Sequence, residues 1–80
     1  MNGDQTVFDL KIGDSGRITG FSSEDVPMKF YELGLSPGSF ITLKKRLPFN
    51  GPVCVQIMDS VQLIALRDTE ARSILIEKFL

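Results

Sequence analysis

The sequence predicts a mainly β protein, a small barrel of about five antiparallel strands with one inserted helix and a short helical turn before the last strand. Three observations predict this class. Short runs of alternating apolar and polar residues recur, glycine and proline pairs separate them, and the segment 22–38 carries helix start and stop signals. In 80 residues, short antiparallel strands bury their faces best by curling into a closed or nearly closed barrel.

The first part of the chain predicts a lead-in segment, a turn and a strand. Residues 6–10 carry Phe8 and Leu10 two positions apart, which indicates a short strand or an extended segment. Residues 12–16 are polar and rich in glycine, as is typical of a turn. Residues 17–21 alternate apolar and polar, the period of a half-buried strand, and Gly20 indicates a bulge or bend within it.

A helix is expected from about residue 25 to Leu33. Residues 22–27 supply cap candidates, acidic first-turn residues and an early proline, a combination typical of a helix start. Val26, Phe30 and Leu33 fall at i, i+4 and i+7, which places them on one buried stripe.

The end of this helix has the clearest local signal in the chain. Gly34 suits the left-handed position just past a helix, and Leu35 would then fold back onto Phe30 in a Schellman ending. Pro37-Gly38 predicts a type II turn directly after it. The segment therefore predicts one helix that leads straight into a β-sheet.

The middle of the chain predicts a hairpin. Asn50-Gly51 is the strongest short hairpin signal, and it lies between strands predicted at residues 40–47 and 53–58. In the second strand Val53, Val55 and Ile57 share a face. In the first strand, one face is expected to carry Ile41, Leu43 and Lys45, and the other Phe40, Thr42, Lys44 and Arg46.

The last third predicts two more strands joined by a helical turn. Residues 61–66 are apolar at consecutive positions, which is consistent with burial on both sides near the closure of the barrel. Residues 68–72 fit one helical turn with Asp68 as N-cap, and residues 74–76 with Phe79 form the final strand. An SH3-like barrel fits the whole pattern better than an open sandwich.

Composition excludes several function classes. The chain has one cysteine, Cys54, and no histidine, so an internal disulfide, a multi-thiolate metal site and every histidine-based nucleophile pair are excluded. Carboxylates such as Asp14, Glu24 and Asp25 are scattered over turns and a helix start, so we expect no specific ferrous site and no cofactor. Cys54 is expected to be a small core residue.

The net charge of −1 argues against general nucleic-acid binding. The N-terminus has neither a basic region nor an apolar region of a signal peptide, and no apolar stretch approaches the roughly 20 residues that span a bilayer. We therefore expect a single cytoplasmic domain over residues 1–80.

Three segments resemble the FeoA family, the small cytosolic partners of the bacterial ferrous iron transporter. Residues 10–18 (LKIGDSGRI) are similar to the family's opening, and residues 32–38 (ELGLSPG) to its helix-to-strand signature. Residues 64–71 (IALRDTEA) resemble its closing strand and final helical turn. The chain departs from the family at Phe30-Tyr31, where Arg-Leu is common, and Lys29 is the nearest cation.

The resemblance implies an SH3-like fold, no enzymatic activity, and interaction with the permease FeoB, which carries a cytosolic GTP-binding domain. The leading hypothesis is thus a binding module that regulates or assembles this permease by direct contact. Because the same domain also occurs fused to iron-dependent regulators, the second hypothesis is a detached regulatory domain of a metal-dependent transcriptional repressor.

The best contact candidate is the tip of the predicted hairpin, residues 48–52. Phe49 is held between two prolines, so it presents apolar area at little entropic cost. In the alternative, Phe49 folds back and covers the end of the barrel. Phe49→Ala separates the two, because lost partner binding with unchanged melting supports a contact, whereas lower stability supports packing.

Two further features are candidates. The basic run 44–46 fits an acidic patch or a membrane surface near the permease, or it protects an edge strand against aggregation. Tyr31 lies one residue off the buried stripe, where it lines a groove for a proline-containing peptide or packs beneath the adjoining loop. The candidate partner-binding residues are Lys29, Tyr31, Lys44, Arg46, Pro48 and Phe49.

Overall fold

The computed structural model describes residues 5–22, 28–49, 51–58 and 60–79. These residues form six strands, two α-helices and one 3₁₀ turn. In chain order they are β1 (Gln5–Thr6), η1 (Val7–Asp9), β2 (Ser15–Phe21), α1 (Met28–Glu32), β3 (Phe40–Arg46), β4 (Val53–Ile57), β5 (Leu63–Leu66), α2 (Asp68–Ser73) and β6 (Ile74–Lys78).

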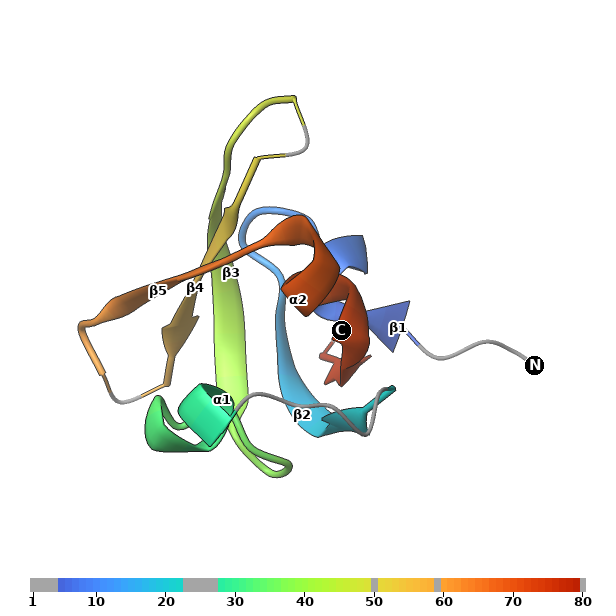
Figure 1. The fold of residues 1–80 in the computed structure, drawn as a ribbon, viewed down its shortest axis with the longest axis vertical. Helices are drawn as coiled ribbons and strands as arrows, with labels where there is room; N and C mark the ends of the chain where they lie inside the picture. Colours follow the sequence, from blue (N-terminus) through green and yellow to red (C-terminus); the bar gives the residue numbers. More distant parts are fainter. Residues whose placement is uncertain (1–4, 23–27, 50, 59, 80) are drawn as a thin grey trace.

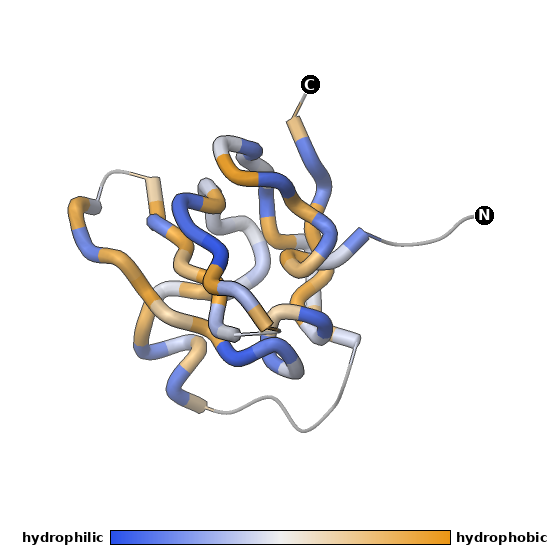
Figure 2. The backbone as a smooth tube through the Cα atoms, turned by 90° about the horizontal axis from the view of Figure 1, so that it is seen from above, coloured by the Kyte–Doolittle hydropathy of each residue, from blue (hydrophilic) through white to orange (hydrophobic). Residues whose placement is uncertain are grey.

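The six strands of the described residues form one antiparallel sheet in the order β1-β6-β2-β3-β4-β5. The sheet curls, with α1 near one end of the molecule and the β3–β4 hairpin projecting at the other (Figure 1). Hydrophobic and hydrophilic stretches alternate along the described residues (Figure 2). The mainly β prediction is confirmed, and the additional strand is the two-residue β1, which lies beside β6.

One apolar core fills the inside of the curled sheet. Buried side chains come from η1, from both helices and from every strand except β1, and none of the described polar or charged residues is buried. Ile18 of β2, Ile41 and Leu43 of β3, and Phe30 of α1 are fully buried. The period-2 pattern therefore predicts the core face correctly in β4 at Val53 and Val55, and in β3 as far as Leu43.

The predicted ending of α1 is confirmed in detail. Gly34 has φ +89°, and its N–H donates to Tyr31 O at 3.1 Å, while the Leu35 N–H donates to Phe30 O at 2.8 Å. These are the two bonds of a Schellman motif, and they end the helix. Gly38 has φ +98° and closes the type II turn that follows.

The extent of the helix and its buried stripe differ from the prediction. The helix described here is Met28–Glu32, and the expected start at residues 25–27, including Val26, lies outside the described residues. Leu33 is 37% exposed and not buried. The reason is the Schellman turn, which takes Leu33 off the helical stripe and brings Leu35 into the core instead.

Gly34→Ala is expected to lower the free energy of unfolding by about 1–2 kcal/mol, because an L-residue is strained at positive φ. A Cβ here would also meet Ile57 Cδ1 at 3.1 Å. Urea unfolding measures the change. Gly20→Ala is the matched control, since a Cβ at Gly20 meets nothing within 4 Å. Equal stability of both variants would contradict the left-handed ending.

Two bulges modify the strands. The β2–β6 register shifts between Ile18 and Gly20, which confirms the bulge predicted at Gly20. The β3–β4 register shifts between Leu43 and Lys45, which no local signal predicted. Since cross-strand partners share a face, pairing of Arg46 with buried Val53 turns Arg46 toward the core side. The prediction that Lys45, rather than Arg46, shares the core face is therefore wrong.

Three other expectations need correction. β5 is buried on one face only, with Leu63 52% exposed and Ile64 6% exposed, because alternate side chains point to opposite faces and only one face of the sheet packs on the core. The N-cap of α2 is Arg67 and not Asp68, since helical geometry begins at Asp68. Cys54 is half-buried rather than in the core, because it alternates with the buried Val53 and Val55 along β4.

Candidate interaction surfaces

The hairpin tip, residues Leu47, Pro48, Phe49, Gly51 and Pro52, is tightly closed. The Leu47 N–H donates to Pro52 O and the Gly51 N–H to Pro48 O, each at 3.1 Å. Within this turn Phe49 has φ +60° and is 97% exposed. The alternative in which Phe49 covers the barrel end is thus wrong, and the side chain contributes nothing to the core.

A bulky residue with positive φ is strained, and such strain concentrates at functional sites. We therefore expect Phe49→Gly to be about 0.5–1 kcal/mol more stable than Phe49→Ala, because only glycine adopts this conformation freely. Thermal unfolding of the two variants measures the difference. Equal stabilities would contradict a strained tip.

The basic run behind the tip divides into two parts. Lys44 and Lys45 are exposed, and neither forms an ion pair among the described residues. They follow the last residue of β3 that has a partner in β2, which is Thr42 opposite Ser15. The two interpretations, partner contact and edge protection, therefore both stay open for these lysines.

Arg46 has a structural role in the fold. Its Nη2 donates to Phe8 O at 2.8 Å and to Leu10 O at 2.7 Å, and its guanidinium lies 5.0 Å from the centre of the Phe8 ring. Arg72 stacks on the same ring at 3.9 Å. Arg46 therefore ties the hairpin to the chain around η1, and this bond network holds the base of the tip.

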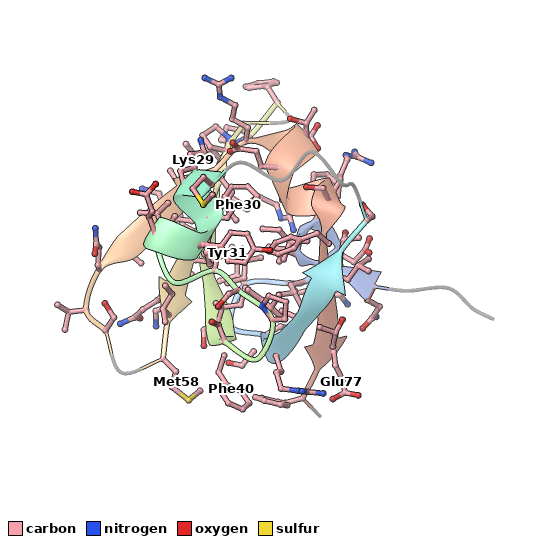
Figure 3. All side chains as sticks on the ribbon, turned by 60° about the horizontal axis from the view of Figure 1, so that its bottom comes forward. Lys29, Phe30, Tyr31, Phe40, Met58 and Glu77 are labelled. Atoms are coloured by element: carbon pink, nitrogen blue, oxygen red, sulfur yellow. The ribbon has the colours of Figure 1, made fainter. Side chains whose placement is uncertain are left out.

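The helix-end surface, residues Met28, Lys29, Tyr31 and Leu33, forms the second candidate. Figure 3 shows Lys29, Phe30 and Tyr31 together on α1. Phe30 is fully buried and stacks on Phe21 at 6.1 Å, whereas Tyr31 is half exposed and meets Phe21 edge-on at 5.8 Å. Tyr31 thus packs on Phe21 while half of its surface stays exposed.

Lys29 links the two helices. Its Nζ lies 2.9 Å from Glu70 Oε2 of α2, and the same carboxylate accepts the Arg67 N–H at 2.9 Å, which caps that helix. The pair is partly exposed, and such ion pairs contribute little to stability. Lys29 is the exposed partner of this pair, at 56% against 15% for Glu70.

Acidification is expected to weaken this link. Burial raises the pKa of Glu70, but the Arg67 N–H and the Lys29 ammonium outweigh it and hold the pKa below the usual 4.5. The resulting stabilisation is complete above pH 4.5 and is lost as the pH falls through the lowered pKa of the folded state. Glu70→Gln should flatten the acid limb of a stability–pH curve, whereas Glu77→Gln, at an exposed strand, should not. Identical stability–pH curves for the two variants would contradict a stabilising role of the Glu70 carboxylate.

The six candidate residues do not form one site. Figure 1 shows α1, which carries Lys29 and Tyr31, and the β3–β4 hairpin tip at opposite ends of the long axis. Lys44, Pro48 and Phe49 belong to the tip end, and Arg46 is used within the fold. A partner that contacts both ends would have to span the whole molecule.

Sequence reasoning missed two surface features. A hollow of about 470 Å³ is lined by Pro52, Arg67, Asp68 and Thr69. The pairing of Val53 with Leu66 brings these segments together, and no local pattern predicts it.

The second is an apolar patch of Phe40, Met58 and Phe79. Phe40 and Phe79 rings lie 5.5 Å apart, and the Met58 N–H donates to Phe40 O at 2.8 Å. Figure 3 shows Met58 beside Phe40 at the same edge as Glu77. The alternation of residues in β3 points Phe40 away from the core, and this pattern could have predicted an exposed apolar residue at this position.

The part of the chain that the structure describes contains no helix both long and apolar enough to traverse a bilayer. Among the same residues, histidine, cysteine, aspartate and glutamate side chains form no group of three or more suited to a metal ion.

Comparisons with known proteins agree on the fold. The chain resembles a FeoA-like protein from Clostridium acetobutylicum (TM-score 0.81, 23% identity, 100% of this chain and 92% of the other). It also resembles zinc-complexed FeoA from Stenotrophomonas maltophilia, described as a prokaryotic SH3 domain protein (TM-score 0.74, 20% identity, 91% and 89%). This likeness confirms the SH3-like class. The comparison with curated proteins finds no match.

A manganese-dependent transcriptional repressor in complex with manganese contains a similar domain, with a TM-score of 0.83 and 23% identity. The likeness covers 99% of this chain but 38% of the repressor. At this identity it shows a shared fold.

The model of the FeoA domain family matches residues 6–78, which include the turn at Gly13, the Schellman ending at Gly34 and the capped helix α2. The family resemblance predicted from three segments is therefore confirmed along nearly the whole chain, and the chain belongs to the FeoA family.

Proposed function

We propose that this protein is a non-enzymatic accessory protein of ferrous iron uptake, which binds the permease FeoB and regulates or assembles it. The observation that carries the proposal is the FeoA family match over residues 6–78. For the Stenotrophomonas maltophilia FeoA, a role as a ferrous iron transport activating factor was suggested. The absence of histidine and the single cysteine favour action by contact rather than by carrying iron.

The helix-end surface is the permease contact in this proposal. Met28 is 71% exposed and Tyr31 50% exposed, so apolar area is available on a short helix. Burial of Phe30 and the Schellman ending hold this helix in one orientation, which lowers the entropic cost of binding. Lys29 adds a cation to this surface, and its side chain is 56% exposed although it pairs with Glu70.

An NMR titration of the labelled protein with the cytosolic GTP-binding domain of FeoB, with and without nucleotide, tests the proposal. Shifts at residues 28–35 are expected, and Tyr31→Ala is expected to weaken binding about tenfold. Val61→Ala is the matched control, because Val61 is 97% exposed on a different loop. Absence of shifts at high micromolar concentration would exclude that domain as the docking site.

The likeness to the repressor favours one alternative, a detached regulatory domain of a metal-dependent transcriptional repressor. This function predicts binding to the DNA-binding or dimerisation portion of such a repressor and indifference to FeoB. The same titration with the repressor portion separates the two functions.

A further inference from the structure

We propose that the hairpin tip inserts into the surface of an anionic lipid bilayer, with Phe49 and Leu47 among the acyl-chain boundary and Lys44 and Lys45 among the headgroups. The first ground is shape. The hairpin projects at the end of the molecule opposite α1 (Figure 1). A projecting, exposed aromatic suits a fluid surface, because it needs no preformed pocket.

The second ground is the order of side chains along the hairpin. Phe49 is 97% exposed and Leu47 36% exposed at the tip, and the exposed Lys45 and Lys44 follow on β3, at most roughly 13–17 Å behind Phe49 along an extended chain. Interfacial elements bury apolar residues about 5–10 Å deep and keep their cations at headgroup level. An acidic protein partner would not require this layering.

The third ground is charge. The whole chain has a net charge of −1, yet residues 33–58 contain no aspartate or glutamate and carry Lys44, Lys45 and Arg46. The hollow beside Pro52 is lined by one cation and one carboxylate, Arg67 and Asp68, so the excess of cations at this end comes from the hairpin itself. Juxtamembrane cations are attracted by anionic lipid headgroups, and this attraction falls with salt.

The tip is also anchored well enough to act as a rigid element. Arg46 binds the carbonyl oxygens of Phe8 and Leu10 at its base, and the two backbone bonds of the turn close its end. Phe49 is held at positive φ, which is strained for a bulky residue, and its side chain is 97% exposed. One aromatic and two lysines give weak, reversible membrane binding, so the tip acts as a second anchor beside a protein contact.

Vesicle binding by the full chain tests this proposal without the permease. The chain contains no tryptophan, so Phe49→Trp provides a single fluorescent reporter, with Val61→Trp as the control at an equally exposed position. We expect vesicles of phosphatidylglycerol and phosphatidylcholine to shift the emission of the Phe49→Trp variant to the blue at low salt. Vesicles of phosphatidylcholine alone should shift it much less, and the control should not respond.

Co-sedimentation with the same vesicles gives the second measurement. Phe49→Ala is expected to weaken partitioning about tenfold, and Lys44→Gln with Lys45→Gln roughly thirtyfold. The control pair is Arg17→Gln with Lys78→Gln, which removes two cations from β2 and β6. Circular dichroism checks that each variant is folded.

Absence of partitioning into anionic vesicles at millimolar lipid would overturn the proposal, as would binding that Phe49→Ala leaves unchanged. A third outcome would make the tip a protein contact instead. In that case the unmodified chain does not bind vesicles, and Phe49→Ala weakens its binding to an isolated FeoB domain in the absence of lipid. The permease titration contains no lipid and the vesicle assay no permease, so failure of one leaves the other interpretable.

Discussion

Phe30→Ala is expected to lower the free energy of unfolding by about 3–5 kcal/mol, the range for truncation of buried aromatic side chains. Phe30 is the one fully buried residue of α1, and its ring stacks on Phe21. The change leaves a cavity under the helix that neighbours fill only partly. Because a domain of this size has a total stability of roughly 5 kcal/mol, we expect a largely destabilised protein in urea unfolding followed by circular dichroism.

The neighbouring Tyr31→Ala is the control, since a half-exposed ring contributes about 1 kcal/mol or less. If Phe30→Ala does not fold, Phe30→Leu keeps most of the apolar volume and should cost roughly 1–2 kcal/mol. Equal losses for Phe30→Ala and Tyr31→Ala would contradict the anchoring role of Phe30 and, with it, a rigid helix-end surface.

Arg46→Met is expected to lower the free energy of unfolding by about 2–3 kcal/mol. Methionine keeps much of the stem but leaves the carbonyl oxygens of Phe8 and Leu10 without their charged donor, and such bonds contribute about 1.5–3 kcal/mol. The contact between the guanidinium and the Phe8 ring is lost as well. Thermal and urea unfolding measure the loss.

Lys44→Met is the matched control, because Lys44 is exposed and its removal should change stability by no more than about 0.5 kcal/mol. Indistinguishable stabilities for the two variants would mean that Arg46 does not hold the hairpin base. If Arg46→Met lost partner binding at unchanged stability, the arginine would be a contact residue, as the sequence alone suggested.

The two proposals assign different tasks to the two ends of the molecule. The helix-end surface is held by burial of Phe30 and by the backbone bonds after Tyr31. The hairpin tip is held by Arg46 and exposes Phe49. Since both ends are anchored independently, variants at one end should leave binding at the other unchanged, which makes the two proposals separable.

Local chemistry in the sequence determined the elements and the ending of the helix. Gly34 and the Pro37-Gly38 pair restrict the backbone within a few residues, so the Schellman motif and the type II turn could be predicted without the rest of the chain. Alternation in β2, β3 and β4 identified core residues such as Ile18, because a strand with one buried face carries a period of two.

The tertiary structure alone decided which candidate residues are free to meet a partner. A bulge at Leu43–Lys45 turns Arg46 inward, and its register depends on the partner strand rather than on residues 44–46 themselves. The ion pair of Lys29 with Glu70 likewise joins residues far apart in the chain. Exposure of Phe49 and the separation of the two surfaces follow from how the sheet curls. Such features arise from long-range contacts, which local periodicity does not contain.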